Sequence, residues 1–299
     1  MTDKIAEIRK LAKDRNAVIL AHNYCRPEVQ DAADFTGDSL ELARRATAVE
    51  ADVIVFCGVR FMAETAAILN PTKTVLLPDP SAGCPMADMI TGAELRALKA
   101  GQPGAKAVCY VNSTAEVKAE CDICVTSGNA EKVMKTFKPT DEILFVPDQH
   151  LGGYISGKLG RVYNLWKGYC PIHAALTAEA VAAAKAAHPG APVIVHPECA
   201  KAVRDAADAC LSTGGMCAWA RESSAQTILV GTEEGILHRL RKENPGKTFV
   251  PVGALVCADM KKITLDNLAA ALRETKTRIT VPPETAIPAK KAIDAMLAI

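Results

Sequence analysis

The sequence lacks the features that would mark a membrane protein or a binder of charged polymers. No apolar stretch approaches the roughly 18 residues that a membrane-spanning helix needs. No block of five or more like charges occurs, and 35 basic residues against 34 acidic ones give a net charge of +1. Proteins that bind nucleic acids or membrane surfaces usually carry a basic face or run. We therefore expect neither nucleic acid nor a membrane among the partners.

Targeting and nucleotide-binding motifs are absent as well. Residues 1–16 are charged throughout and have no apolar centre, which is unlike a signal peptide, so we expect a cytoplasmic protein. The sequence contains no Walker A motif and no G-x-G-x-x-G after a strand-like run. ATP and NAD are therefore not expected as cofactors.

Cysteine, in contrast, is abundant, with 11 among 299 residues. In a reducing compartment, thiols rarely form a disulfide framework, and an odd number cannot pair completely. Ligation of a metal or cluster, catalysis and packing as a small apolar residue remain as roles. Only the position of each cysteine in the sequence can separate these roles.

Three segments of the chain resemble one another. Each begins with an apolar run, at residues 17–22, 107–111 and 192–195, and continues through a helix-like stretch to Asp34, Asp122 or Asp208. Strand-like runs that alternate with helix-like segments are typical of βαβ units with parallel sheets. We predict an α/β fold of three small homologous αβα domains around a pseudo-threefold axis, with the active site at the centre.

The repeat also predicts where further strands and the domain boundaries lie. Second strands are expected at 52–58, 122–128 and 208–214, with Ser39–Ala48 as an additional helix of the first unit. Third strands are expected to end at Pro78, Pro147 and Pro251. The expected units are 1–90, 91–175 and 176–261, and residues 262–299 are expected to pack on the first unit.

Three cysteines follow the period of the repeat. Cys84, Cys170 and Cys257 are spaced by 86 and 87 residues and follow the predicted third strands. Ligand sites of α/β sheets lie beyond the carboxyl ends of the strands, so these thiols should converge. Because a [4Fe–4S] cluster usually takes four thiolates, three would leave one iron open as a Lewis acid. Three buried thiols or a three-cysteine zinc site are the alternatives, although structural zinc favours four ligands in short-spaced pairs.

The remaining cysteines do not follow this period. Cys121 and Cys124 have the spacing of a redox pair, but they lie at the start of a strand rather than at a helix N-terminus. We predict that Cys124 packs in the core, and the same prediction covers Cys57, Cys109 and Cys210. Cys25, Cys199 and Cys217 are expected to be structural.

Polar clusters follow the first strand of each unit. They are His22–Tyr24, Tyr110–Ser113 and His196–Glu198. Ser127 and Thr213 precede glycines at predicted helix starts, where backbone N–H groups and the helix dipole favour anions. A substrate with carboxylates or phosphate would suit such a pocket.

Taken together, these stretches resemble the quinolinate synthase family of NAD biosynthesis. The matching stretches are His22–Gln30, Gly37–Leu40, Phe61–Ala66, Tyr110–Thr114, His196–Cys199, Ser212–Met216 and Cys257–Met260. They are spread over most of the chain. One departure is Cys25, where the family more often has glutamine.

The resemblance implies a cofactor, a reaction and a set of site residues. In the short form of the family, three cysteines hold a [4Fe–4S] cluster between three α/β domains, which implies Cys84, Cys170 and Cys257 as ligands. The family condenses iminoaspartate with dihydroxyacetone phosphate to give quinolinate, phosphate and water. The enzyme that supplies iminoaspartate is a further candidate partner.

The resemblance also implies a role for each matching residue. His22, Ser39, Ser127 and Thr213 would hold carboxylates and phosphate, while Tyr110, Val111, Asn112, His173 and Pro197 would contribute to the substrate pocket. Tyr24, Tyr110, His196 and Glu198 would be catalytic, with Tyr24 as an acid/base candidate. Substrate carboxylates beside Glu198 would raise its pKa, because like charges favour its neutral form.

Two other functions share parts of this pattern. An iron–sulfur hydro-lyase of the aconitase type, acting on another small polycarboxylate, would use the same open iron. A cluster-based redox or iron sensor would need an effector domain or a nucleic-acid surface, and the nearly neutral charge suggests neither.

Overall fold

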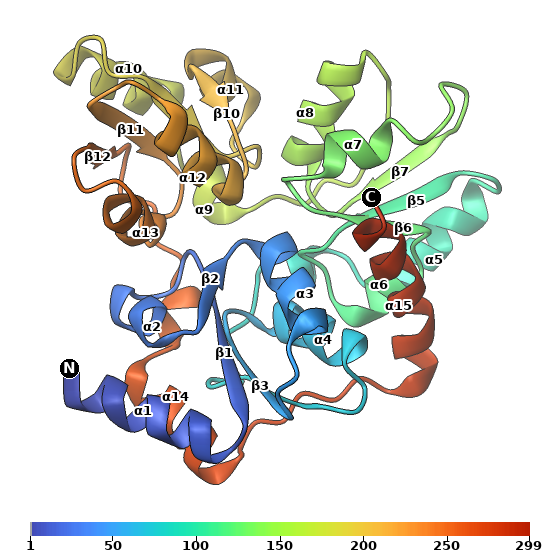
Figure 1. Cartoon of the computed structure of the whole chain (residues 1–299). Coiled ribbons are helices and arrows are strands. Elements are labelled where there is room, and N and C mark those ends of the chain that lie inside the picture. Colours follow the sequence, from blue (N-terminus) through green and yellow to red (C-terminus); the bar gives the residue numbers. More distant parts are fainter. Residues whose placement is uncertain (1) are drawn as a thin grey trace.

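The computed structural model describes residues 2–299, which form three α/β units around a common centre (Figure 1). Each unit alternates four helices with four strands. The first contains β1 (Ala17–His22), β2 (Phe35–Gly37), β3 (Val53–Cys57) and β4 (Thr74–Leu76), with α1 (Thr2–Asp14), α2 (Pro27–Ala32), α3 (Ser39–Ala48) and α4 (Arg60–Leu69). The second contains β5 (Lys106–Tyr110), β6 (Ile123–Val125), β7 (Ile143–Val146) and β8 (Asn164–Leu165), with α5 (Gly92–Gly101), α6 (Ala115–Ala119), α7 (Ala130–Met134) and α8 (Gln149–Leu159). The third contains β9 (Val193–Val195), β10 (Ala209–Cys210), β11 (Thr227–Gly231) and β12 (Thr248–Pro251), with α10 (Ala178–Ala187), α11 (Lys201–Ala206), α12 (Thr213–Glu222) and α13 (Ile236–Glu243).

The three sheets have the same topology. Their strand orders are β2-β1-β3-β4, β6-β5-β7-β8 and β10-β9-β11-β12, and every pairing is parallel. The central pair β1 and β3 is in register from Ala17↔Val53 to Ala21↔Cys57. In each unit the first two helices pack together and the last two pack together, for example α10 with α11 and α12 with α13. The predicted fold class, three small αβα domains with parallel sheets, is confirmed.

An aspartate clamps the same two strands in every unit. The Oδ2 atoms of Asp34, Asp122 and Asp208 accept hydrogen bonds from the backbone N–H groups of Ile19, Ala107 and Val193, at 2.8, 2.8 and 2.7 Å. The backbone N–H of each aspartate donates to the carbonyl of the same partner residue. The aspartates recognised in the sequence repeat therefore fix where the second strand starts beside the first.

The strand assignment inside the units differs from the expectation. The true second strand of the first unit is β2, which directly follows Asp34, and the run at 52–58 forms the third strand, β3. Consequently α3 is the equivalent of α7 and α12 rather than an additional helix. The expected third strands near Pro78 and Pro251 are the fourth strands β4 and β12, while β7 is a true third strand. Short edge strands such as β2 and β8, with three and two residues, carry too few apolar side chains to be recognised.

A short helix follows each periodic cysteine. These helices are η1 (Ala87–Met89), α9 (Pro171–Ala174) and η2 (Met260–Lys262). The backbone carbonyls of Cys84, Cys170 and Cys257 each accept a hydrogen bond from the residue four positions later. The cysteines thus follow the fourth strands, not the third, and they keep equivalent places in the repeat.

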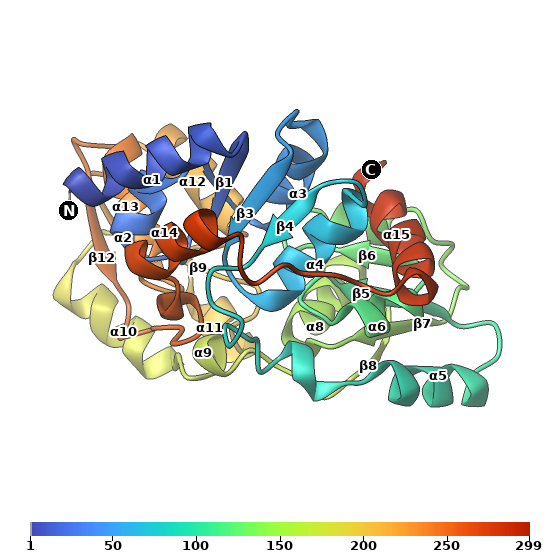
Figure 2. The same cartoon turned by 90° about the horizontal axis from the view of Figure 1, so that it is seen from below.

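The C-terminal residues cover two units instead of one. Helix α14 (Leu265–Glu274) packs on α1, as expected, but α15 (Pro283–Leu297) packs mainly on α6 and β6 of the second unit (Figure 1). The segment between these helices runs along the edge strand β4, with which it exchanges hydrogen bonds at Val75 and Leu77 (Figure 2). It therefore covers an edge that would otherwise expose unpaired backbone groups.

Buried apolar side chains form one continuous core through the first and second units, while the third unit has a separate core on each face of its sheet. None of the helices within residues 2–299 has both the length and the apolar character required to cross a membrane.

The aspartate clamp can be tested at Asp122. Asp122→Ala should lower the free energy of unfolding by about 1 kcal/mol, because one backbone donor loses its acceptor. Asp122→Asn keeps an acceptor oxygen and should lower it by less. Asp205→Ala, which removes an exposed pair with Lys201, should change it by less than about 0.5 kcal/mol. Urea unfolding measures all three, and equal losses for the two Asp122 variants would contradict the clamp.

Candidate active site

The carboxyl ends of strands from all three sheets face one cavity of about 260 Å³. Because parallel strands end at the same edge of a sheet, their following loops gather there. Every site residue expected from the sequence lines this cavity except Val111 and Pro197. The lining members of that set are His22, Tyr24, Ser39, Cys84, Tyr110, Asn112, Ser127, Cys170, His173, His196, Glu198, Thr213 and Cys257.

Two equivalent histidine turns follow β1 and β9. The Nδ1 atoms of His22 and His196 accept hydrogen bonds from the backbone N–H groups of Tyr24 and Glu198, at 3.2 and 3.3 Å. In each neutral ring the proton therefore sits on Nε2. For His196, Nε2 lies 3.2 Å from Oγ of Ser127 and can donate to it.

The loops after the second strands meet at their helix starts. Asp38 caps α3 by accepting from the N–H groups of Leu40 and Glu41, and Ser212 caps α12 by accepting from that of Gly215. A Cβ added at Gly214 would lie 2.6 Å from Oδ2 of Asp38, so only glycine fits there without a shift. This close approach brings the N-termini of two ten-residue helices to one wall of the cavity.

The three cysteine loops contact one another at another wall. The N–H of Gly83 donates to Oδ1 of Asp259 at 3.2 Å, and Nε1 of Trp166 donates to the carbonyl of Met89 at 2.8 Å. The N–H of Cys257 donates to Oε1 of the buried Glu233 at 3.1 Å. One cysteine from each unit thus lines the same cavity, and thiolates are the usual ligands of iron–sulfur clusters.

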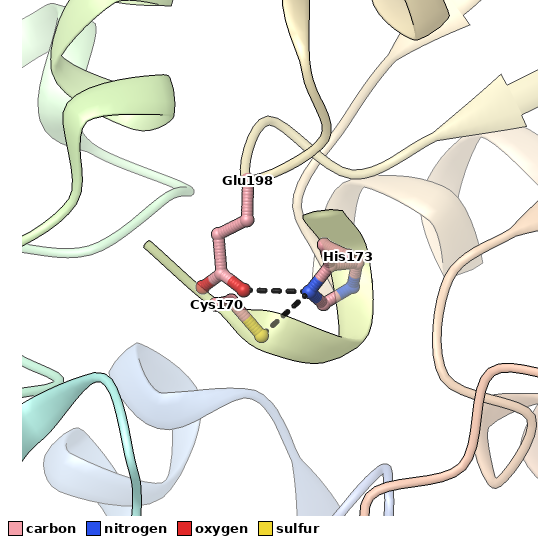
Figure 3. Close-up of side chains that lie close together, drawn as sticks. All are labelled: Cys170, His173 and Glu198. Carbon is pink, nitrogen blue, oxygen red and sulfur yellow. Dashed lines mark hydrogen bonds and ion pairs between the residues drawn. The ribbon is translucent and has the colours of Figure 1, made fainter. Parts of the chain in front are cut away.

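Glu198 is the centre of a buried polar network (Figure 3). Its Oε1 accepts from the hydroxyl of Tyr110 at 2.5 Å, and its Oε2 lies 2.7 Å from Nδ1 of His173. Nδ1 of His173 also lies 3.2 Å from Sγ of Cys170, so a thiol, an imidazole and a carboxylate form a compact group (Figure 3). His173 stacks on His196, with ring centroids 4.7 Å apart.

These surroundings fix the charges of the site. Burial would raise the pKa of Glu198, but the neighbouring imidazoles of His196 and His173 and the hydrogen bonds from His173 and Tyr110 hold this pKa well below the usual range. Its pKa in the protein alone is therefore lowered, whereas the sequence argument, which assumed substrate carboxylates nearby, expected a raised value. Burial lowers the pKa values of His22 and His196 to about 3, so both rings are neutral near pH 7.

Tyr24 is held by a residue that the sequence patterns did not single out. Its hydroxyl lies 2.5 Å from Oγ1 of Thr232, which in turn lies 2.7 Å from Nε2 of His173. Burial and the charge of Glu198 raise the pKa of Tyr24 well above its ordinary value, so the phenol keeps its proton at neutral pH. Thr232 directly follows β11. The repeat pattern did not predict this strand, so it did not indicate the residue at its end.

The lining contains acidic side chains but, within residues 2–299, neither lysine nor arginine. The acidic side chains are those of Glu198, Glu233, Asp38 and Asp259. The buried Oδ1 of Asn112 has no hydrogen-bond partner among residues 2–299. Helix N-termini or a bound cation can therefore supply positive potential at the lining, and Asn112 can accept a hydrogen bond from a ligand.

Val111 and Pro197 do not line the cavity, and their backbone groups make hydrogen bonds within the fold. The N–H of Val111 donates to the carbonyl of Val125, which continues the pairing of β5 with β6. The carbonyl of Pro197 accepts from Arg204 at 3.1 Å.

The non-periodic cysteines lie outside the cavity. Cys57, Cys109 and Cys124 are fully buried in the core, as predicted, whereas Cys210 is only half-buried. Cys25, Cys199 and Cys217, which were expected to be structural, are buried.

Comparison with known proteins identifies the family. The sequence model of the quinolinate synthetase A protein family matches residues 6–298. The chain is 55% identical over 298 residues to the quinolinate synthase of Dehalococcoides mccartyi (strain ATCC BAA-2100), which covers 99% of this chain and 97% of that protein. The chain belongs to the quinolinate synthase family.

Other quinolinate synthases match to a similar extent. That of Methanoregula boonei is 54% identical over 294 residues, covering 98% of this chain and 97% of its own. That of Geobacter metallireducens is 52% identical over 294 residues, covering 98% and 96%. The resemblance inferred from short motifs is confirmed over nearly the whole chain, and membership makes this chain an enzyme of NAD biosynthesis.

The neutral histidines make stability depend on pH. Their folded pKa values, about 3, lie below the unfolded value of about 6.5, so only the unfolded chain gains these protons as the pH falls. The free energy of unfolding should fall from pH 6.5 to 5.0 by up to about 1.4 kcal/mol per pH unit for each ring. In His196→Gln, urea unfolding should show a free energy of unfolding that changes less steeply with pH, by the equivalent of about one proton. An unchanged slope against pH would contradict the neutral state of His196.

Proposed function

We propose that this chain condenses iminoaspartate with dihydroxyacetone phosphate to form quinolinate, phosphate and two waters. The observation that carries the proposal is the convergence of three equivalent strand-end cysteines and the Glu198 network on one cavity. Membership in the quinolinate synthase family supports the same reaction. The enzyme that supplies iminoaspartate is the protein partner this activity implies.

Cys84, Cys170 and Cys257 are the proposed ligands of a [4Fe–4S] cluster. Each comes from a different unit, each precedes a short helix, and all three line the cavity. The short-spaced cysteine pairs of structural zinc sites do not occur among them. With three thiolate ligands, one iron would lack a protein ligand and would supply a Lewis acid for loss of a substrate hydroxyl.

Substrate carboxylates and phosphate would bind at the helix starts. Ser39 and Thr213 are the first residues of α3 and α12, where each side chain offers a hydroxyl and the helix dipole favours anions. Ser127 adds a hydroxyl from the second unit, and the neutral ring of His22 can donate from Nε2. These donors compensate for the missing lysine and arginine side chains.

Proton transfer would use Tyr24 and the Glu198 network. Tyr24 keeps its proton at neutral pH and lines the cavity, so it can give a proton to a leaving hydroxyl or take one back. The carboxylate of Glu198 accepts from Tyr110 and His173, which orients both side chains toward the substrate. Tyr24 and Glu198 are thereby the two ends of one chain of hydrogen bonds that runs through Thr232 and His173.

A product assay tests the reaction. Anaerobically purified protein should form quinolinate only when iminoaspartate and dihydroxyacetone phosphate are both present. Glu198→Gln should keep its iron but lower kcat by about 100-fold, because general acid–base groups contribute roughly that much or more. Hydration of a dicarboxylate without condensation would instead identify a hydro-lyase, and near-normal turnover of Glu198→Gln would remove this residue from proton transfer.

Iron content tests the ligand set. Cys84→Ser should lose most of the iron, about four atoms per chain in the parent protein, together with its broad visible absorption. Cys124→Ser is the matched control, because this thiol is equally a cysteine but lies in the core of the second unit. Retention of the cluster in Cys84→Ser, with loss in Cys124→Ser, would refute the assignment.

A further inference from the structure

Asn23 joins an arginine of the third unit to the anion-binding wall of the cavity. It follows β1, is completely buried, and does not itself line the cavity. Nη1 of Arg239, on α13, donates to Oδ1 of Asn23 at 3.0 Å. Nδ2 of Asn23 lies 3.1 Å from Oγ1 of Thr213, which does line the cavity.

The direction of these hydrogen bonds follows from the chemistry of the groups. A guanidinium can only donate, so the atom of Asn23 that faces Arg239 must be its carbonyl oxygen. The amide nitrogen then faces Thr213 and donates to Oγ1. Since that oxygen accepts a hydrogen bond from Asn23, the hydroxyl proton of Thr213 remains free to be donated into the cavity.

Asn23 and Arg239 are both held in place by further hydrogen bonds. The N–H of Asn23 donates to the carbonyl of Gly37 at 3.0 Å, and its own carbonyl accepts from Nε2 of Gln30 at 3.1 Å. Arg239 is also paired through Nε with Glu243 at 2.7 Å. The amide therefore has little freedom to rotate, and its orientation does not depend on a bound ligand.

We propose that Asn23 is a positioning residue that fixes Thr213 as a hydrogen-bond donor to an anionic oxygen, a carboxylate or phosphate oxygen, of the substrate. Arg239 acts through it, because a charged donor polarises the amide and strengthens the next hydrogen bond in the chain. This extends the influence of one half-buried cation to a cavity that no lysine or arginine of residues 2–299 lines. The proposal deepens the proposed function and rests on it for the identity of the substrate.

The isosteric variant Asn23→Asp tests the direction of the chain. A carboxylate still pairs with Arg239, but it can only accept, so Thr213 must donate to it and can no longer donate to the substrate. KM for one substrate should rise about 10- to 100-fold, the effect expected for loss of a hydrogen bond to a charged group, while kcat changes by less than about threefold. Separate KM values for iminoaspartate and dihydroxyacetone phosphate show whether the anion held is a carboxylate or the phosphate.

A direct binding measurement separates this inference from the reaction itself. Calorimetric titration with inorganic phosphate and with quinolinate should show weaker binding of one of them to Asn23→Asp, with iron content unchanged. If the parent protein makes no quinolinate, the proposed function fails, and this titration still decides the role of Asn23. Unchanged affinity for both anions, together with unchanged KM values, would overturn the inference.

Two further variants control for stability. Asn70→Asp makes the same change at a buried asparagine whose Nδ2 donates to the carbonyl of Ala66, away from the cavity, and it should leave both KM values unchanged. Arg239→Met removes the obligate donor and should raise the same KM as Asn23→Asp. Should Asn23→Asp not fold, Arg239→Met decides: unchanged KM values and anion affinities in it would equally overturn the inference.

Discussion

The parallel direction of the strands is the constraint on which the rest of the structure depends. In each of three sheets with identical strand order, all strands end at the same edge, and these edges face one another across a single cavity. A residue that directly follows a strand is therefore delivered to the cavity by topology alone. The turns after the first strands, the helix starts after the second strands and the cysteine loops are three successive positions in this scheme, and each occurs once per unit. No individual sheet contains a complete site.

In the proposed reaction the cavity would accept an anionic substrate, although no lysine or arginine of residues 2–299 lines it. Acidic groups line it. Arg239 does not line it but bonds to Asn23, and Lys261 pairs with Glu233. The hydroxyls of Ser39 and Thr213, the first residues of α3 and α12, offer hydrogen bonds at two helix N-termini without bulky charged side chains. In a cluster bound by the three cysteines, the iron without a protein ligand would be a Lewis acid for an anionic oxygen, so metal binding and anion binding would support each other.

Much of the site could be predicted from sequence because its residues obey the period of the repeat. Cys84, Cys170 and Cys257 stand at equal spacing, and His22 and His196 occupy equivalent turns. The strand assignment within each unit could not be predicted equally well, because β2 and β8 are too short and too polar to show a pattern. Thr232 was not recognised as a site residue, and Asn23 was recognised only as a member of a polar cluster, for a related reason. Each acts through a neighbour from another unit, and no local pattern records that neighbour.

The amino-acid sequence by itself determined the α/β class, the threefold repeat, the family and the periodic cysteines, since these depend on spacing along one chain. Only the tertiary structure decided the charge state of Glu198 and the placement of α15 on the second unit. It also decided the hydrogen-bond direction at Thr213. The reason is physical: burial, neighbouring charges and hydrogen-bond partners come from residues far apart in the chain, and their effects exist only once the three units are assembled.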